Sequence, residues 1–155
     1  METLLLTGKT LNVIKTLGLD VIIHTLQSTT SIIGSSISYI TSIECSSIDS
    51  IKTKLQKIDI EKTINIIHLF INELNSKKDI KDFVKISIIS INEILQQIES
   101  DLNSIKKDIE YHITKYFSSW RSINCDVKLN NIEVNSNILE KRFELLIKLL
   151  SVNTI

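Results

Sequence analysis

Proline and alanine are absent from the 155-residue sequence, which holds only three glycines and two cysteines. The cysteines, Cys45 and Cys125, lie far apart and fit neither a disulfide-rich secreted scaffold nor a paired-cysteine metal knuckle. The first residues also lack the basic start and long apolar stretch of a secretory signal. We therefore expect two reduced thiols in a cytosol-like compartment, and the predicted localisation is cytoplasmic.

The scarce residues have a common origin. Proline, alanine, glycine and arginine have GC-rich codons, whereas isoleucine fills 31 of the 155 positions. The simplest interpretation is an extremely AT-rich source genome, as in some large DNA viruses, protozoa and endosymbionts. A viral source would make the host cytoplasm or the virion the compartment.

Charge of either sign is not in excess, because 18 Lys and Arg balance 18 Asp and Glu. A nucleic-acid-binding protein concentrates Lys and Arg on one face, so we expect no nucleic-acid partner. A chain of this length fits one domain and can bury a core without metal or disulfides. The predicted organisation is a single helical domain over residues 1–155.

Hydrophobic periodicity predicts the fold class, because isoleucine on propensity alone would favour strands. The strongest row has spacings of four and three and predicts a helix over residues 79–119. Weaker rows predict helices over residues 3–44, 48–75 and 137–150. The row of residues 79–119 comprises Val84, Ile88, Ile91, Leu95, Ile98, Leu102, Ile105 and Ile109. The sequence thus predicts an all-α, elongated, up-and-down bundle of four or five long helices. The first helix is predicted to be broken or bent near Gly18 or Gly34.

Asparagines interrupt the pattern over residues 122–136. Val127-Lys128-Leu129 and Ile132-Glu133-Val134 alternate around Asn130-Asn131, as in a two-residue hairpin. We expect a short Asn-rich loop or a hairpin there.

Residues 21–43 carry no formal charge. Ile33, Ile37 and Ile40 keep helical spacing beside small residues, so this helix is predicted to be buried or to support self-association in a homo-oligomer. The alternative is a membrane-active or lipid-contacting helix, which polar residues within the segment argue against. Membrane contact is therefore the weaker expectation.

Motifs for chemistry are sparse. Gly8-Lys9-Thr10 matches the end of a phosphate-binding loop, but Thr3 replaces the first glycine and only two residues precede it. The histidines His24, His68 and His112 have no Glu-x-x-His spacing, so we expect no metal and no cofactor. We expect His112, on the seam of the long helix, to be partly buried with a local partner.

Aromatic residues are concentrated at one place, where Tyr111, Tyr116, Phe117 and Trp120 precede Arg121. These residue types are enriched at protein interfaces, although they could also simply fill the end of a bundle. No catalytic spacing accompanies them. The sequence therefore predicts a protein that is not an enzyme and acts through protein–protein interaction in a structural, scaffold or adaptor role.

Overall fold

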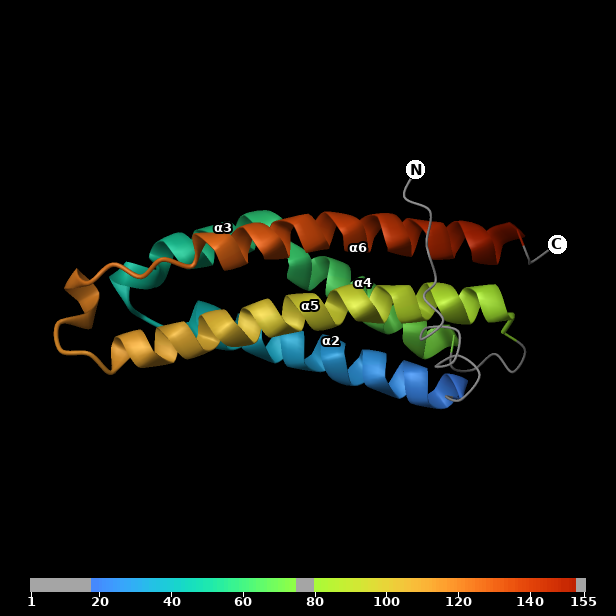
Figure 1. Cartoon of the computed structure of the whole chain (residues 1–155), viewed down its shortest axis with the longest axis horizontal. Helices are drawn as coiled ribbons and strands as arrows, with labels where there is room; N and C mark the ends of the chain where they lie inside the picture. The colour runs from blue at the N-terminus through green and yellow to red at the C-terminus, as the bar shows by residue number, and fades with distance from the viewer. Residues whose placement is uncertain (1–17, 75–79, 153–155) are drawn as a thin grey trace.

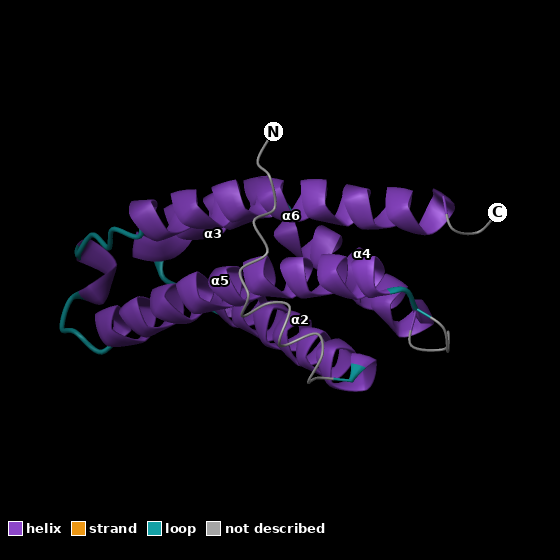
Figure 2. Ribbon diagram, turned by 45° about the vertical axis from the view of Figure 1, so that its right-hand side comes forward, coloured by secondary structure: helices purple, strands orange, loops and turns teal. Residues whose placement is uncertain are grey.

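The computed structural model describes residues 18–74 and 80–152, and these residues form helices and their connections (Figure 2). Five α-helices and two short 3-10 helices lie within those ranges. They are α2 (Leu19–Ser42), η1 (Ser46–Ile48), α3 (Asp49–Ile58), α4 (Ile60–Leu74), α5 (Asp82–Ile113), η2 (Ser118–Trp120) and α6 (Asp126–Val152). The all-α prediction is confirmed.

The helices run up and down along one long axis (Figure 1). α2 runs towards one end of the molecule, and α3 and α4 run back one after the other. α5 then runs in the same direction as α2, and α6 runs back beside it. The most extensive helix–helix contacts are those of α5 with α6 and of α2 with α5. The 32 residues of α5 span about 48 Å at about 1.5 Å per residue, so the bundle is elongated as predicted.

The core explains why an isoleucine-rich chain becomes helical. The predicted row from Val84 to Ile109 lies on the buried face of α5, and Ile67, Ile71 and Leu74 do the same on α4. Spacings of three and four bring these side chains onto one stripe. Burial of that stripe overrides the weak helix propensity of β-branched residues.

The predicted helix over residues 48–75 is wrong in one respect, because Asp59 divides it into α3 and α4. Asp59 has φ 53°, and its N–H donates to the carbonyls of Leu55 and Gln56. The sequence carried a signal for this break, since the apolar row ending at Ile58 and the one starting at Ile60 are out of register. A continuous helix would aim the two rows in different directions, whereas the turn directs both to the core.

The predicted boundaries of the last two helices also need correction. α5 ends at Ile113 rather than residue 119, because Phe117 adopts φ 60° and the chain leaves the helix axis. The predicted Asn-rich loop or hairpin over residues 122–136 is helical from Asp126 onwards. Buried Leu129 and Ile132 keep helical spacing with Cys125, and their burial outweighs the weak helix propensity of asparagine.

α2 packs into the bundle with one face, and Ile33, Ile37 and Ile40 are buried there in the chain's own core. The opposite face is exposed, with Val21 at 48% and Ile32 at 39%, so self-association through residues 21–43 stays a prediction. Two polar pairs join α2 to α4: Thr30 Oγ1 lies 3.0 Å from His68 Nδ1, and Gln27 donates to Asn72.

The alternative of lipid contact by residues 21–43 stays a prediction. Within the described ranges, no helix combines the length and apolarity that crossing a membrane requires.

Candidate interaction surface

The connection between α5 and α6 projects from one end of the bundle (Figure 1). The predicted interface residues lie at this end: Tyr111 is in the last turn of α5, and the connection carries Tyr116, Phe117, Trp120 and Arg121. We call these five residues the aromatic tip. All five are exposed, with Trp120 at 84% and Tyr116 at 79% of their full accessible areas. The alternative that these aromatics fill the end of the core is therefore excluded.

Three rings of the aromatic tip pack on one another rather than pointing independently into solvent. The Tyr116 and Phe117 rings meet edge to face, with centroids 4.4 Å apart and an interplanar angle of 81°. Phe117 stacks on Trp120 at 5.4 Å and 15°. The left-handed backbone of Phe117 and the short helix η2 bring these rings together. Sequence spacing does not reveal this, because it depends on where α5 stops.

Positive charge accompanies the rings. The Nζ atom of Lys115 lies 4.2 Å from the centroid of the Tyr111 ring, a cation–π arrangement. A hydrogen bond to Lys115 and then its charge lower the pKa of the Tyr111 phenol below its ordinary value. From Thr114 to Arg121 the chain contains two basic residues and no acidic one. The aromatic tip therefore presents apolar rings within a locally cationic segment.

His112 ties the aromatic tip to the rest of the bundle. Its side chain is 7% exposed, as expected for a histidine on the α5 seam. The Nε2 atom lies 2.7 Å from the carbonyl oxygen of Ser118 and 2.8 Å from the hydroxyl oxygen of Ser47 in η1. The His112 imidazole thus links the connection between α2 and α3 to the connection between α5 and α6. The prediction of a local partner for His112 is confirmed.

The Ser47–His112 pair resembles a nucleophile and its base in distance only. A carbonyl oxygen accepts hydrogen bonds but cannot donate, so the bond to Ser118 assigns the proton to Nε2. Nε2 then has no lone pair with which to take a proton from Ser47. The Ser47 hydroxyl oxygen instead accepts from the same Nε2–H, which it shares with the Ser118 carbonyl, and it also lies 3.0 Å from Cys45 Sγ. The arrangement supports positioning of the aromatic tip rather than nucleophilic catalysis.

The Cys125 thiol does not supply a reactive group either. Both cysteines are free, and Cys125 is buried at the start of α6. Burial, followed by the nearby Asp108 carboxylate, raises the pKa of the Cys125 thiol. A raised pKa lowers the thiolate fraction at neutral pH, so Cys125 is a poor nucleophile.

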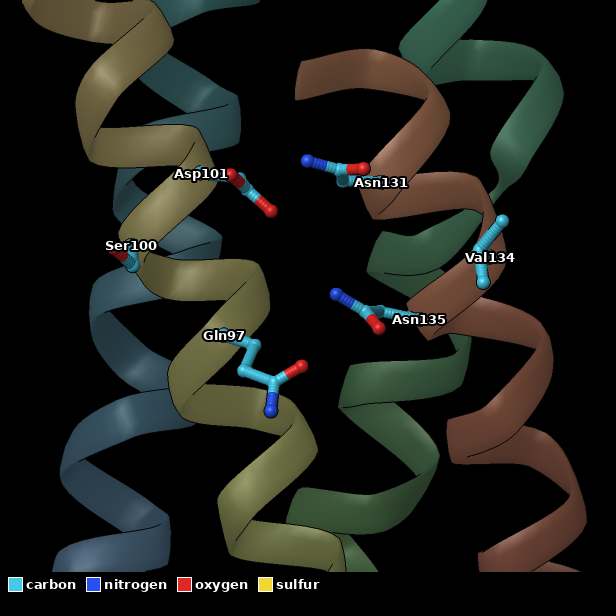
Figure 3. Close-up of a pocket in the computed structure, with 6 residues that line it drawn as sticks. All are labelled: Gln97, Ser100, Asp101, Asn131, Val134 and Asn135. Atoms are coloured by element: carbon cyan, nitrogen blue, oxygen red, sulfur yellow. The ribbon is translucent and has the colours of Figure 1, made fainter. Parts of the chain in front are cut away.

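A polar groove of about 390 Å³ lies between α5 and α6 (Figure 3). Gln97 and Asp101 on α5 face Asn131 and Asn135 on α6. On each helix, the two residues are one turn apart. Burial raises the pKa of Asp101, while Lys128 and a hydrogen bond to Asn131 oppose the shift less strongly. Hydrogen-bonding side chains from both helices therefore line the groove between α5 and α6. Sequence analysis missed it because it placed Asn131 and Asn135 in a loop.

Metal or nucleotide chemistry finds no support in the described residues. Across residues 18–74 and 80–152, no three His, Cys, Asp or Glu side chains gather as metal ligands would. His68 and His112 are engaged with Thr30 and with Ser47, respectively. The phosphate-loop-like Gly8-Lys9-Thr10 lies outside the described residues.

Fold and surface together define a class: an all-α bundle with an exposed aromatic end. No known protein family matches the chain, and no solved structure matches it. It is similar to an uncharacterized protein of Acanthamoeba polyphaga mimivirus, with 37% identity over 100 residues. The match covers 63% of this chain and 46% of that protein, so the chain spans about half the length of the curated relative it matches.

Proposed function

We propose that this protein is a non-enzymatic binding protein, a scaffold or adaptor that engages another protein through its aromatic tip. The observation that carries the proposal is the stacked, solvent-exposed cluster of Tyr116, Phe117 and Trp120. Such rings supply large contact areas at low entropic cost, and Trp, Tyr and Arg dominate binding energy at protein interfaces.

A foreign partner fits the aromatic tip better than a second tip does. Lys115 and Arg121 would approach their own counterparts if two tips met end to end, and like charges at an interface are costly. A partner with an apolar recess and acidic rim meets both features. The His112 bonds to Ser47 and Ser118 fix the loop before binding, which reduces the entropy lost on association.

We also propose a viral source. The similarity to a mimivirus protein supports it, as does the isoleucine-rich composition expected of an AT-rich genome. The two free cysteines fit a reducing compartment, so we propose the host cytoplasm or the virion as the place of action.

Capture of partners by immobilised full-length protein tests the proposal. The wild type is compared with Trp120→Ser and with Leu69→Ser, a control that removes an exposed apolar side chain from α4. We expect a defined set of host proteins on the wild type and on Leu69→Ser. Loss of an interface anchor typically costs at least about 2 kcal/mol, so Trp120→Ser should weaken binding about 30-fold or more. Equal capture by all three proteins would refute a role for the aromatic tip.

A further inference from the structure

The last four turns of α6 are apolar on more than one face. Nine of the fifteen residues from Ile138 to Val152 are apolar, yet of these nine only Leu139 and Leu146 are buried. A helix that is apolar all round is normally covered on all sides. This half of α6 therefore presents two further apolar surfaces, one on each side of its core stripe.

The first surface is a small pocket between α4 and α6. It has a volume of about 190 Å³ and is lined by Thr63, Ile66, Glu140, Phe143 and Glu144; we call it the acidic pocket. Ile66 is 51% exposed. Glu140 and Glu144 are one helical turn apart, so both carboxylates lie on the α6 side of the pocket. Neither takes part in an ion pair with another described residue.

The second surface is a ridge with the opposite charge. Leu145 is 42% exposed and has Lys141 four residues before it and Lys148 three residues after it; we call these three residues the basic ridge. These spacings place both ammonium groups beside Leu145 on one helix face. Within the described ranges, neither lysine has an acidic partner.

We propose that the basic ridge of one copy docks in the acidic pocket of a second copy. Leu145 would fill the apolar floor formed by Ile66 and Phe143, and the two lysines would lie against Glu140 and Glu144. The opposite charges that flank an apolar residue on one surface and an apolar pocket on the other make this chain's own helix a suitable occupant. The contact does not use the aromatic tip, so it stands or falls independently of the proposed function.

The geometry also predicts what kind of assembly forms. At about 100° per residue, Leu145 lies about 160° around the helix from Phe143. The ridge and the pocket therefore have separate apolar centres, with Glu144 and Lys148 one helical turn apart at the border between them. Each copy can donate one surface and accept with the other. Such a heterologous contact builds rings or open chains rather than a closed two-fold dimer.

Light scattering coupled to size exclusion tests the proposal on full-length protein over a range of concentrations. Leu145→Glu disables the ridge, and Ile66→Glu disables the pocket. Val127→Glu is the matched control, because Val127 is an exposed apolar residue at the other end of α6. Circular dichroism confirms that each variant keeps the helical fold, as substitutions at exposed positions should allow.

We expect the wild type and Val127→Glu to exceed the 17.7 kDa monomer mass increasingly with concentration. Each disabling variant alone should stay at the monomer mass. An equimolar mixture of the two should form a complex of two copies and nothing larger, since one intact ridge meets one intact pocket. A wild type that is monomeric throughout would overturn the proposal and leave the pocket to a foreign helix. Association that survives either variant, or a mixture that stays monomeric, would overturn it as well.

Discussion

His112 offers the sharpest test of how the aromatic tip is held. His112→Phe keeps a ring of similar size at the buried end of α5 but removes the N–H donor. The Ser118 carbonyl and the Ser47 hydroxyl then lose the partner that lies 2.7 and 2.8 Å away. Both the stability of the bundle and the order of η2 should decrease.

The size of the effect follows from the loss of one donor that two oxygens share. Leaving partly buried acceptors without their donor costs about 1–3 kcal/mol. For a chain of this length, about 1 kcal/mol shifts the melting temperature by about 2–4 °C. We therefore expect His112→Phe to melt about 2–12 °C below the wild type.

Thermal unfolding followed by circular dichroism measures the loss of stability. Trp120 is the only tryptophan of the chain, so the anisotropy of its fluorescence reports the order of the aromatic tip directly. Anisotropy should fall in His112→Phe and remain unchanged in Tyr111→Phe, which alters the exposed neighbouring residue. A double-mutant cycle with Ser47→Ala should give a non-zero coupling, because the two side chains share a bond. A melting temperature within about 1 °C of the wild type, with unchanged anisotropy, would refute this account of His112.

Two further substitutions test the groove and the helix break. Burial raises the pKa of Asp101, so the folded protein favours the protonated carboxyl group. The contribution of Asp101 to the free energy of unfolding is therefore fully present at pH values below the ordinary aspartate pKa, and it is lost as the pH rises through the raised pKa. Asp101→Asn should accordingly have the same melting temperature as the wild type in acid and a higher one at neutral pH. A lower melting temperature of the variant at neutral pH would contradict the burial argument. Asp59 has φ 53°, a region that glycine enters freely, so urea unfolding should show Asp59→Gly about 0.5–1 kcal/mol more stable than Asp59→Ala. Equal stability of the two variants would mean that the left-handed turn is not what ends α3.

Hydrophobic spacing predicted the parts of the fold in which one apolar row persists. α5 is the clearest case, since the row from Val84 to Ile109 repeats at three and four residues and is buried as expected. The spacing failed where a local feature redirected the chain. The rows before and after Asp59 predict one helix over residues 48–75, although their shift in register reports a turn between two helices.

The start of α6 shows how composition misled the prediction. Five asparagines between residues 122 and 137 suggested a loop, and alternation around Asn130-Asn131 suggested a hairpin. The row of Cys125, Leu129 and Ile132 already carried the helical signal, because these residues recur at four and three. Burial of that row decides the conformation, whereas asparagine propensity is a weaker effect.

The sequence allowed us to predict which residues form the candidate interaction surface, but not how their rings pack. Clustering of Tyr116, Phe117 and Trp120 in the sequence marked the region. The stacking of Phe117 on Trp120 depends on the end of α5 at Ile113 and on the tether from His112. The partners of His112 are remote in sequence or lie across a turn, so helical periodicity carries no information about them.

Photo-crosslinking from position 120 tests the central claim most directly. Trp120 is replaced in full-length protein by a photoreactive phenylalanine analogue, and the same analogue at Leu69 serves as the exposed control on α4. After irradiation in host cells, the account predicts a discrete cross-linked protein from position 120 that is absent from position 69. Identical cross-link patterns from the two positions, or none from position 120, would contradict the claim that this protein acts through its aromatic tip.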